Sequence, residues 1–187
     1  MSNETMTPRQ RQVQAFIAAL TRLDPGGRAR LKRNAGRMLT AARDIHRVFF
    51  QALPYEVTEW QQEDYFLIAT LFPLVPHNPQ AGNLGETLRR VRQLRAGPDD
   101  SRLNSLDRRF QTLLDSDREQ LLFRLRQVVR LIAAHREGVA LNWERLLLDV
   151  INWEHPDHSV QLRWARAYFV GAYEITASVE EPKGNQP

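Results

Sequence analysis

The sequence predicts an all-α protein of about eight helices arranged in two packed helical bundles. Apolar residues recur at intervals of three and four along most of the chain, which is the spacing of one face of an α-helix. No alternating strand series, β-hairpin or internal repeat interrupts this pattern. With 187 residues, of which 42% are hydrophobic, the chain is long enough to bury a substantial core.

We expect the N-terminal bundle to cover residues 7–96. Thr7 and Pro8 predict the cap and the first position of a helix, and residues 24–27 are expected to end that helix. Further helical blocks are predicted at residues 28–53, 59–74 and 83–95.

The C-terminal bundle is predicted over residues 101–177, after a boundary at residues 96–100 whose Gly-Pro pair ends the preceding helix. Polar capping residues predict the starts of its four helices, at Ser101, Ser116, Asn142 and Ser159. Residues 178–187 lack apolar residues at helical spacing and are expected to form a disordered tail.

The block at residues 28–53 combines an apolar stripe with a row of cations. Apolar or small residues follow one helical face at Leu31, Ala35, Met38, Ala42, Ile45 and Phe49. The opposite side of the same helix would carry Lys32, Arg33, Arg37, Arg43 and Arg47. The run 34–36 leaves open a division into two shorter helices, because Gly in a helix interior costs roughly 1 kcal/mol against Ala. The pattern alone fits a solvated helix face equally well.

Charge is distributed unevenly along the chain. Residues 1–50 carry ten Lys or Arg against three Asp or Glu, and residues 89–136 carry twelve against six. Residues 51–88 carry five acids and no base, and residues 137–187 carry eight acids against four bases. Such segregation favours a polyanionic partner over charge that serves only solubility.

The residue patterns of common enzymes are missing. The sequence has no cysteine, Gly-rich phosphate loop, HExxH, GxSxG or paired-carboxylate motif. Glu154, His155, Asp157 and His158 form the only compact group of metal-ligand type, and Pro156 makes a polar turn between helices the simpler explanation. We therefore expect no catalytic residue, no metal and no cofactor.

Aromatic residues near the C-terminus allow two interpretations. The set Trp143, Trp153, Trp164, Tyr168 and Phe169 could stack on the bases of a single strand, but its spacing among Leu and Val favours a core. The sequence has no apolar run of the roughly 18 residues that span a bilayer and no apolar signal core, so we expect no membrane partner and a cytoplasmic location.

Several segments together resemble the CasB family, the small subunit of the type I-E CRISPR surveillance complex (Cascade). The run LNWERLLLDVINWEHPDHSVQLRWARAYF resembles the family's terminal pair of helices. Upstream, the pieces LDPGGRARLKR, YFLIATLFPLVP, NLGETLRR and SLDRRFQTLLDSDREQLL occur in the family's order. The resemblance covers Arg11 to Phe169, and its specificity lies in this order because no piece is a catalytic signature.

The resemblance implies a non-enzymatic, all-helical subunit that stabilises the R-loop. It implies contacts to the displaced DNA strand, to duplex DNA and to the guide RNA in its hybrid. It also implies contacts to the backbone and large subunits of the complex and to a second copy of the chain. Base pairing would carry the sequence specificity, while protein contacts tip a nearly balanced strand exchange.

The candidate nucleic-acid-binding residues come from two sources. The resemblance to the family's basic surface implies Lys32, Arg33, Arg108, Arg109 and Arg126. Helical geometry adds Arg37, Arg43, Arg47 and Arg130. Two alternatives stay open: a purely structural adaptor that links subunits through charged faces, and a metal-dependent nuclease built on the group at residues 154–158.

Overall fold

The computed structural model describes residues 6–95, 101–135 and 138–177. Within these ranges the regular structure consists of nine α-helices, four short 3-10 turns and one isolated β-bridge between His77 and Leu141. The predicted all-α fold is confirmed. The α-helices are α1 (Pro8–Thr21), α2 (Pro25–Arg33), α3 (His46–Ala52), α4 (Gln62–Leu71), α5 (Leu84–Arg95), α6 (Ser101–Leu114), α7 (Arg118–Ala133), α8 (Trp143–Ile151) and α9 (Ser159–Ala177). The 3-10 turns are η1 (Leu39–Ala41), η2 (Arg43–Ile45), η3 (Glu59–Gln61) and η4 (Phe72–Leu74).

Side-chain caps fix where several helices begin. Thr7 and Gln10 form a reciprocal capping box at the start of α1. Asn142 accepts a hydrogen bond from the backbone N–H of Arg145 at 3.0 Å at the start of α8. Residues 24–27 do more than end α1, because Asp24 caps α2 and Pro25 occupies its first position.

The basic block at residues 28–53 is not one helix. It divides at the run left open by the sequence: α2 ends at Arg33, Gly36 adopts a φ of +86°, and two 3-10 turns precede α3. The apolar stripe is buried except at Met38, whose side chain is 56% exposed. The cations of this block therefore do not share one continuous helical face.

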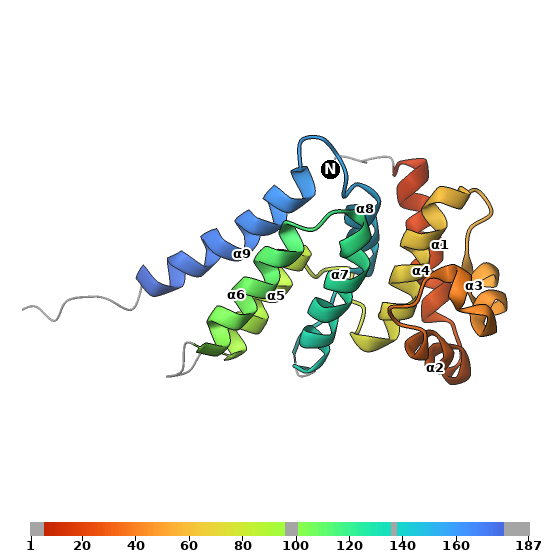
Figure 1. Cartoon of the computed structure of the whole chain (residues 1–187), viewed down its shortest axis with the longest axis horizontal. Coiled ribbons are helices and arrows are strands. Elements are labelled where there is room, and N and C mark those ends of the chain that lie inside the picture. The colour runs from red at the N-terminus through yellow and green to blue at the C-terminus, as the bar shows by residue number, and fades with distance from the viewer. Residues whose placement is uncertain (1–5, 96–100, 136–137, 178–187) are drawn as a thin grey trace, which may run out of the picture.

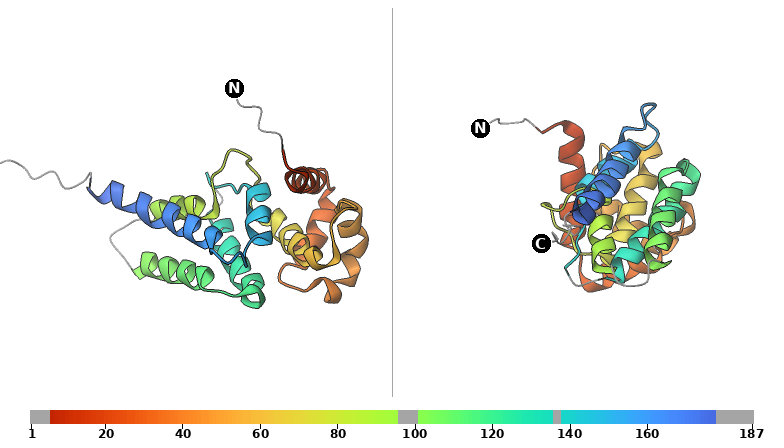
Figure 2. Two further views of the ribbon diagram at one scale, coloured as in Figure 1. Left: turned by 90° about the horizontal axis from the view of Figure 1, so that it is seen from above. Right: turned by 90° about the vertical axis from the view of Figure 1, so that its left-hand side faces the viewer.

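The molecule is elongated, with α5, α6 and α9 at one end and α1 to α4 at the other (Figure 1). The helices α7 and α8 lie between these ends, and the view from above shows the same order (Figure 2). Contacts join α8 to α1 and α4, and α7 to α6 and α4. Buried apolar side chains from Val13 to Tyr168 consequently form one continuous core.

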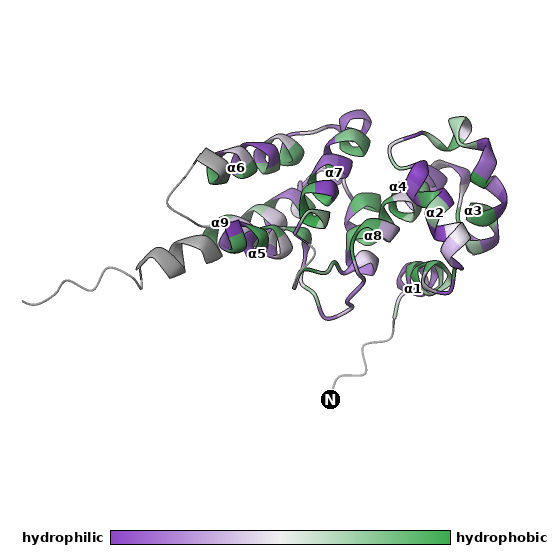
Figure 3. Ribbon diagram, turned by 90° about the horizontal axis from the view of Figure 1, so that it is seen from below, coloured by the Kyte–Doolittle hydropathy of each residue, from purple (hydrophilic) through white to green (hydrophobic). Residues whose placement is uncertain are grey.

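The helix α5 packs along α9 and also contacts α6, although its place in the sequence predicted that it belongs to the N-terminal bundle. The boundary expected at residues 96–100 and the tail expected at residues 178–187 lie outside the described residues, so the division into two bundles stays a prediction. Hydrophilic and hydrophobic residues occupy different sides of α5, α6 and α7 (Figure 3). No helix in the described ranges has both the length and the hydropathy to cross a membrane.

Candidate nucleic-acid interface

The helix α7 presents two of the predicted cations next to each other. Its buried face carries Leu121, Leu125 and Val129, which anchor it to the core. Arg126 and Arg130 are one helical turn apart on the outward side. Partial burial and, second, the positive charge of Arg130 lower the pKa of Arg126 below its ordinary value. An anion bound here would relieve the repulsion between the two guanidinium groups.

The loop after α2 lies directly against Arg126. A Cβ atom built on Gly36 would come within 2.2 Å of the Nη1 atom of Arg126, which is far inside contact distance. The guanidinium of Arg126 therefore covers the backbone of Gly36. Its Nε atom is shielded from solvent and has no hydrogen-bond partner among the described residues. The fold thus brings the N-terminal basic block and α7 together at this point.

A basic hollow opens where α5, α6 and α7 meet. Its volume is about 410 Å³, and its lining includes the guanidinium-bearing residues Arg95, Arg109 and Arg130, one from each helix. No acidic residue is among its described lining residues. Burial and then the charge of Arg95 lower the pKa of nearby His135, which disfavours the charged form of this imidazole.

Arg95 was missing from the predicted site. Its sequence position at the end of α5 gives no signal, because only the packing of three helices places it beside Arg109 and Arg130. Helical periodicity marks Arg95 as a surface residue but cannot say which neighbouring element it faces.

Among the described residues, the nine predicted cations lack the ion pairs that several other arginines form with carboxylates. Within the described parts of the chain, none of the nine predicted residues forms an ion pair with a carboxylate, and eight are exposed while Arg126 is half-buried. By contrast, Arg92 pairs with Asp107 on α6 at 3.2 Å. Arg118 pairs with Asp64 and Arg163 with Asp149, so these arginines hold helices together.

The structure does not gather all nine residues. Lys32 lines a different hollow, together with Arg28 and residues 72–77. Arg37 lies in the loop next to Gly36 and donates a hydrogen bond to Asn34 at 3.3 Å. The other four residues are exposed on α2, η2, α3 and α6 and line none of these hollows: Arg33, Arg43, Arg47 and Arg108.

The aromatic residues near the C-terminus belong to the core, as expected. Trp143, Trp153 and Trp164 are at most 1% exposed. Their indole N–H groups donate to the carbonyl of Val75, the carbonyl of Ser116 and the carboxylate of Asp149, respectively. Tyr168 is buried and Phe169 packs against the core. The three indoles and the Tyr168 ring therefore have no open face on which a base could stack, and Phe169 is half-buried.

The group at residues 154–158 is a solvent-exposed turn. His155 lies 3.5 Å from Asp157, and all four side chains of metal-ligand type are exposed. His158 adopts a φ of +46° in this turn. Across the described residues, no group of three or more His, Asp or Glu side chains is placed to hold a metal ion.

Comparison with known proteins connects this chain to a family. Residues 27–169 match the family model of the CRISPR-associated protein Cse2. A CRISPR-associated protein Cse2 from Thermus thermophilus is 38% identical over 128 residues, which are 67% of this chain. The match spans 66% of that relative's length, slightly less than two thirds.

Solved structures show the same fold. CasB of M. ruber has a TM-score of 0.68 at 26% identity, covering 94% of this chain and 100% of that chain. A Cse2-family protein of Thermus thermophilus has a TM-score of 0.70 at 27% identity, covering 88% and 99%. A chain of a CRISPR RNA-guided surveillance complex has a TM-score of 0.72 at 19% identity, covering 92% and 99%, which shows the fold alone. Because the family model matches well over half of the sequence, this chain belongs to the CRISPR-associated Cse2 (CasB) family.

Proposed function

We propose that the chain is a non-enzymatic small subunit of a type I-E CRISPR RNA-guided surveillance complex in the cytoplasm. There it stabilises the R-loop by sequence-independent contacts to phosphates of the displaced DNA strand and of the guide–target hybrid. Family membership and the fold shared with a chain of a CRISPR RNA-guided surveillance complex support this assignment. The proposed protein partners are the backbone subunits, the large subunit and a second copy of the chain.

The observation that carries the proposal is the basic hollow between α5, α6 and α7. Arg95, Arg109 and Arg130 enter it from three helices, and Arg126 extends the positive surface to the loop at Gly36. Surface arginines that serve only solubility are expected to be interspersed with acids. Here the lining holds three guanidinium groups and no carboxylate among the described residues.

The chemistry of these groups suits phosphate better than bases. A guanidinium donates two parallel N–H bonds to a phosphate, stays charged at any physiological pH and carries no information about sequence. Exchange of a DNA duplex for an RNA–DNA hybrid is nearly balanced, so a few such contacts shift it toward the open state. The proposal extends to the remaining predicted cations on the surface, Lys32, Arg33, Arg37, Arg43, Arg47 and Arg108.

A double charge reversal, Arg109→Glu with Arg130→Glu, tests the proposal in the assembled complex. We expect assembly with guide RNA, followed by gel filtration, to match the wild type, because both residues bind nucleic acid and not protein. The lifetime of the R-loop, followed with a labelled target duplex, should fall at least tenfold. Arg166→Glu on the exposed side of α9 is the control. Failed assembly, or an unchanged R-loop lifetime, would contradict the proposal.

A structural adaptor is the second candidate, and exposed aromatic residues favour it. Phe50, Tyr55 and Trp60 are 47%, 100% and 65% exposed. Tyr55 and Trp60 lie in the stretch 51–88, which has five acids and no base. Aromatic side chains are enriched among the residues that dominate protein interfaces. If the adaptor function alone is correct, Trp60→Ala will abolish assembly and the double charge reversal will leave R-loop lifetime unchanged.

A further inference from the structure

A groove runs along α1 and α2, apart from the basic hollow. One part, of about 650 Å³, lies between α2 and residues 72–77. The other, of about 580 Å³, lies between α1 and the start of α8. Thr21 and His77 line both parts, so the two hollows adjoin at these residues and are together called the groove.

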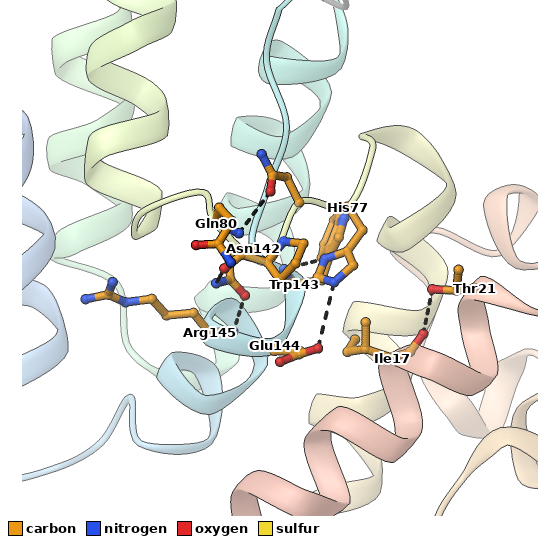
Figure 4. Close-up of polar contacts among 10 residues, drawn as sticks. Ile17, Thr21, His77, Gln80, Asn142, Trp143, Glu144 and Arg145 are labelled. Carbon is orange, nitrogen blue, oxygen red and sulfur yellow. Dashed lines mark hydrogen bonds and ion pairs between the residues drawn. The ribbon is translucent and has the colours of Figure 1, made fainter. Parts of the chain in front are cut away.

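The junction of the two parts is fixed by hydrogen bonds (Figure 4). Thr21 donates through Oγ1 to the carbonyl of Ile17 at 2.9 Å. His77 accepts from the backbone N–H of Trp143 at 3.4 Å through Nδ1, and its Nε2 lies 3.8 Å from a carboxylate oxygen of Glu144. The backbone beside His77 is paired with Leu141 at 2.9 Å in both directions. These contacts fix the position of His77 at the junction of the two parts.

The charge of the groove is strongly positive. Its edges carry four exposed cations: Arg11, Arg22, Arg28 and Lys32. Glu144 is the one acid among its described lining residues, and it faces His77. In the described chain these cations form no ion pair, and Arg28 donates to the carbonyl of Thr21. An occupant that brings several negative charges would be complementary.

The wall of the groove is aliphatic. Pro73, Leu74 and Pro76 line it on one side, and Ala15 and Ala18 line it on the other. The aromatic ring at this wall, Phe72, is only 8% exposed and packs against Trp143 with ring centroids 5.7 Å apart. The one other aromatic ring in the described lining is the His77 imidazole, whose side chain is only 18% exposed, so the groove offers a nucleic-acid strand little to stack on. An extended peptide can instead place apolar side chains on the wall while its acids reach the edges.

We propose that this groove docks an acidic peptide segment of a partner protein. Carboxylates of the segment pair with Arg11, Arg22, Arg28 and Lys32, and its aliphatic side chains cover residues 73–76. This function goes beyond phosphate binding, and at Lys32 alone it replaces the phosphate contact proposed above with a contact to a carboxylate of the partner. The groove and the basic hollow then serve two different classes of partner on one small subunit.

The test is fluorescence anisotropy with a short labelled peptide in which glutamate and leucine alternate. Arg22→Glu with Lys32→Glu reverses charge on both parts of the groove, while Ala15→Trp fills it without changing charge; Ala15 is exposed, so both variants should fold. We expect each to weaken peptide binding at least tenfold, with unchanged circular dichroism. Arg130→Glu, which lies outside the groove, should bind the peptide like the wild type.

Several results would overturn the proposal. The wild type could fail to bind the glutamate–leucine peptide, or it could bind a lysine–leucine peptide with equal affinity. The Arg130→Glu variant could also lose as much affinity for the peptide as the groove variants do. Labelled oligothymidine provides the nucleic-acid comparison. If it binds wild type and loses affinity in the two groove variants but not in Arg130→Glu, the groove is a nucleic-acid site and the peptide proposal is wrong.

Discussion

Two features disfavour a side chain at position 36. The backbone of Gly36 has a φ of +86°, and the guanidinium of Arg126 occupies the place of a Cβ atom. The left-handed backbone conformation disfavours any residue with a Cβ atom. The arginine lies where that atom would stand, so a substitution also displaces a member of the basic surface. One residue therefore joins the end of α2 to α7 and sets the position of a candidate phosphate ligand.

We expect Gly36→Ala to lower the free energy of unfolding by about 1–2 kcal/mol, because the new methyl group adds backbone strain and displaces Arg126. Urea unfolding measures this loss. Gly26→Ala is the matched control, since its Cβ would meet only the Asp24 carboxylate at 3.7 Å. The control should be neutral or slightly stabilising. Equal stability of the two variants would contradict the inferred close contact.

Burial of the Tyr65 side chain makes the stability of the protein depend on pH in the alkaline range. Tyr65 is 1% exposed and packs edge-on against Phe16, and its burial raises the pKa of the phenol to about 12. The pKa in the unfolded chain is near 10. A raised pKa contributes stability that is complete below pH 10 and is lost as the pH rises toward 12.

We therefore expect the free energy of unfolding to fall between pH 10 and pH 12, with Tyr65 contributing about 1.4 kcal/mol per pH unit. Tyr65→Phe should remove this contribution and flatten the slope. Tyr55→Phe, at a fully exposed ring, should leave the slope as it is. The measurement is urea unfolding across this pH range. Identical slopes in all three proteins would show that the buried phenol ionises as easily as an exposed one.

At the scale of elements, the contact of α5 with α9 depends on a small residue. A Cβ atom on Gly85 would come within 2.1 Å of the backbone carbonyl oxygen of Trp164. Backbone atoms cannot move aside as a flexible side chain can, so a methyl group here forces the two helices apart. The pair carries much of the packing at this end of the molecule (Figure 1).

We expect Gly85→Ala to destabilise the protein by about 1–3 kcal/mol despite the higher helix propensity of Ala, because overpacking outweighs that gain. Thermal unfolding followed by circular dichroism measures the effect. The exposed position Ser105 on α6 offers a control, Ser105→Ala, which should change stability little. A stabilised Gly85→Ala variant would contradict the close approach of α5 and α9.

Capping residues in the sequence were enough to predict where most of the helices begin. Thr7 and Asn142 cap helices as expected, because a cap depends on residues three positions away. The sequence pattern predicts only a helix end at residues 24–27, whereas the same Pro-Gly run also begins α2, because the chemistry that ends one helix can begin the next. The packing of α5 on α9 joins residues far apart in sequence, and no local pattern indicates it.

For the whole molecule, the sequence located the basic regions but not their geometry. Arg109, Arg126 and Arg130 were predicted separately, and the fold places them along α6 and α7 with Arg95 added by packing. Lys32 and Arg33 are adjacent in sequence, yet Lys32 lines a hollow that Arg33 does not. Neighbours in a helix point about 100° apart, so the contact partner of each depends on tertiary packing.

The most direct test of the basic hollow is the salt dependence of single-stranded DNA binding. Fluorescence anisotropy would compare wild type, Arg109→Ala with Arg130→Ala, and the exposed control Arg9→Ala with Arg166→Ala, which has the same net charge. Because the first variant lacks two guanidinium groups that bind phosphate, its slope of log affinity against log salt should flatten by roughly 1.4, and the control's slope much less. Equal slopes in the two variants would mean that net charge alone governs binding, and the hollow would not be a nucleic-acid site.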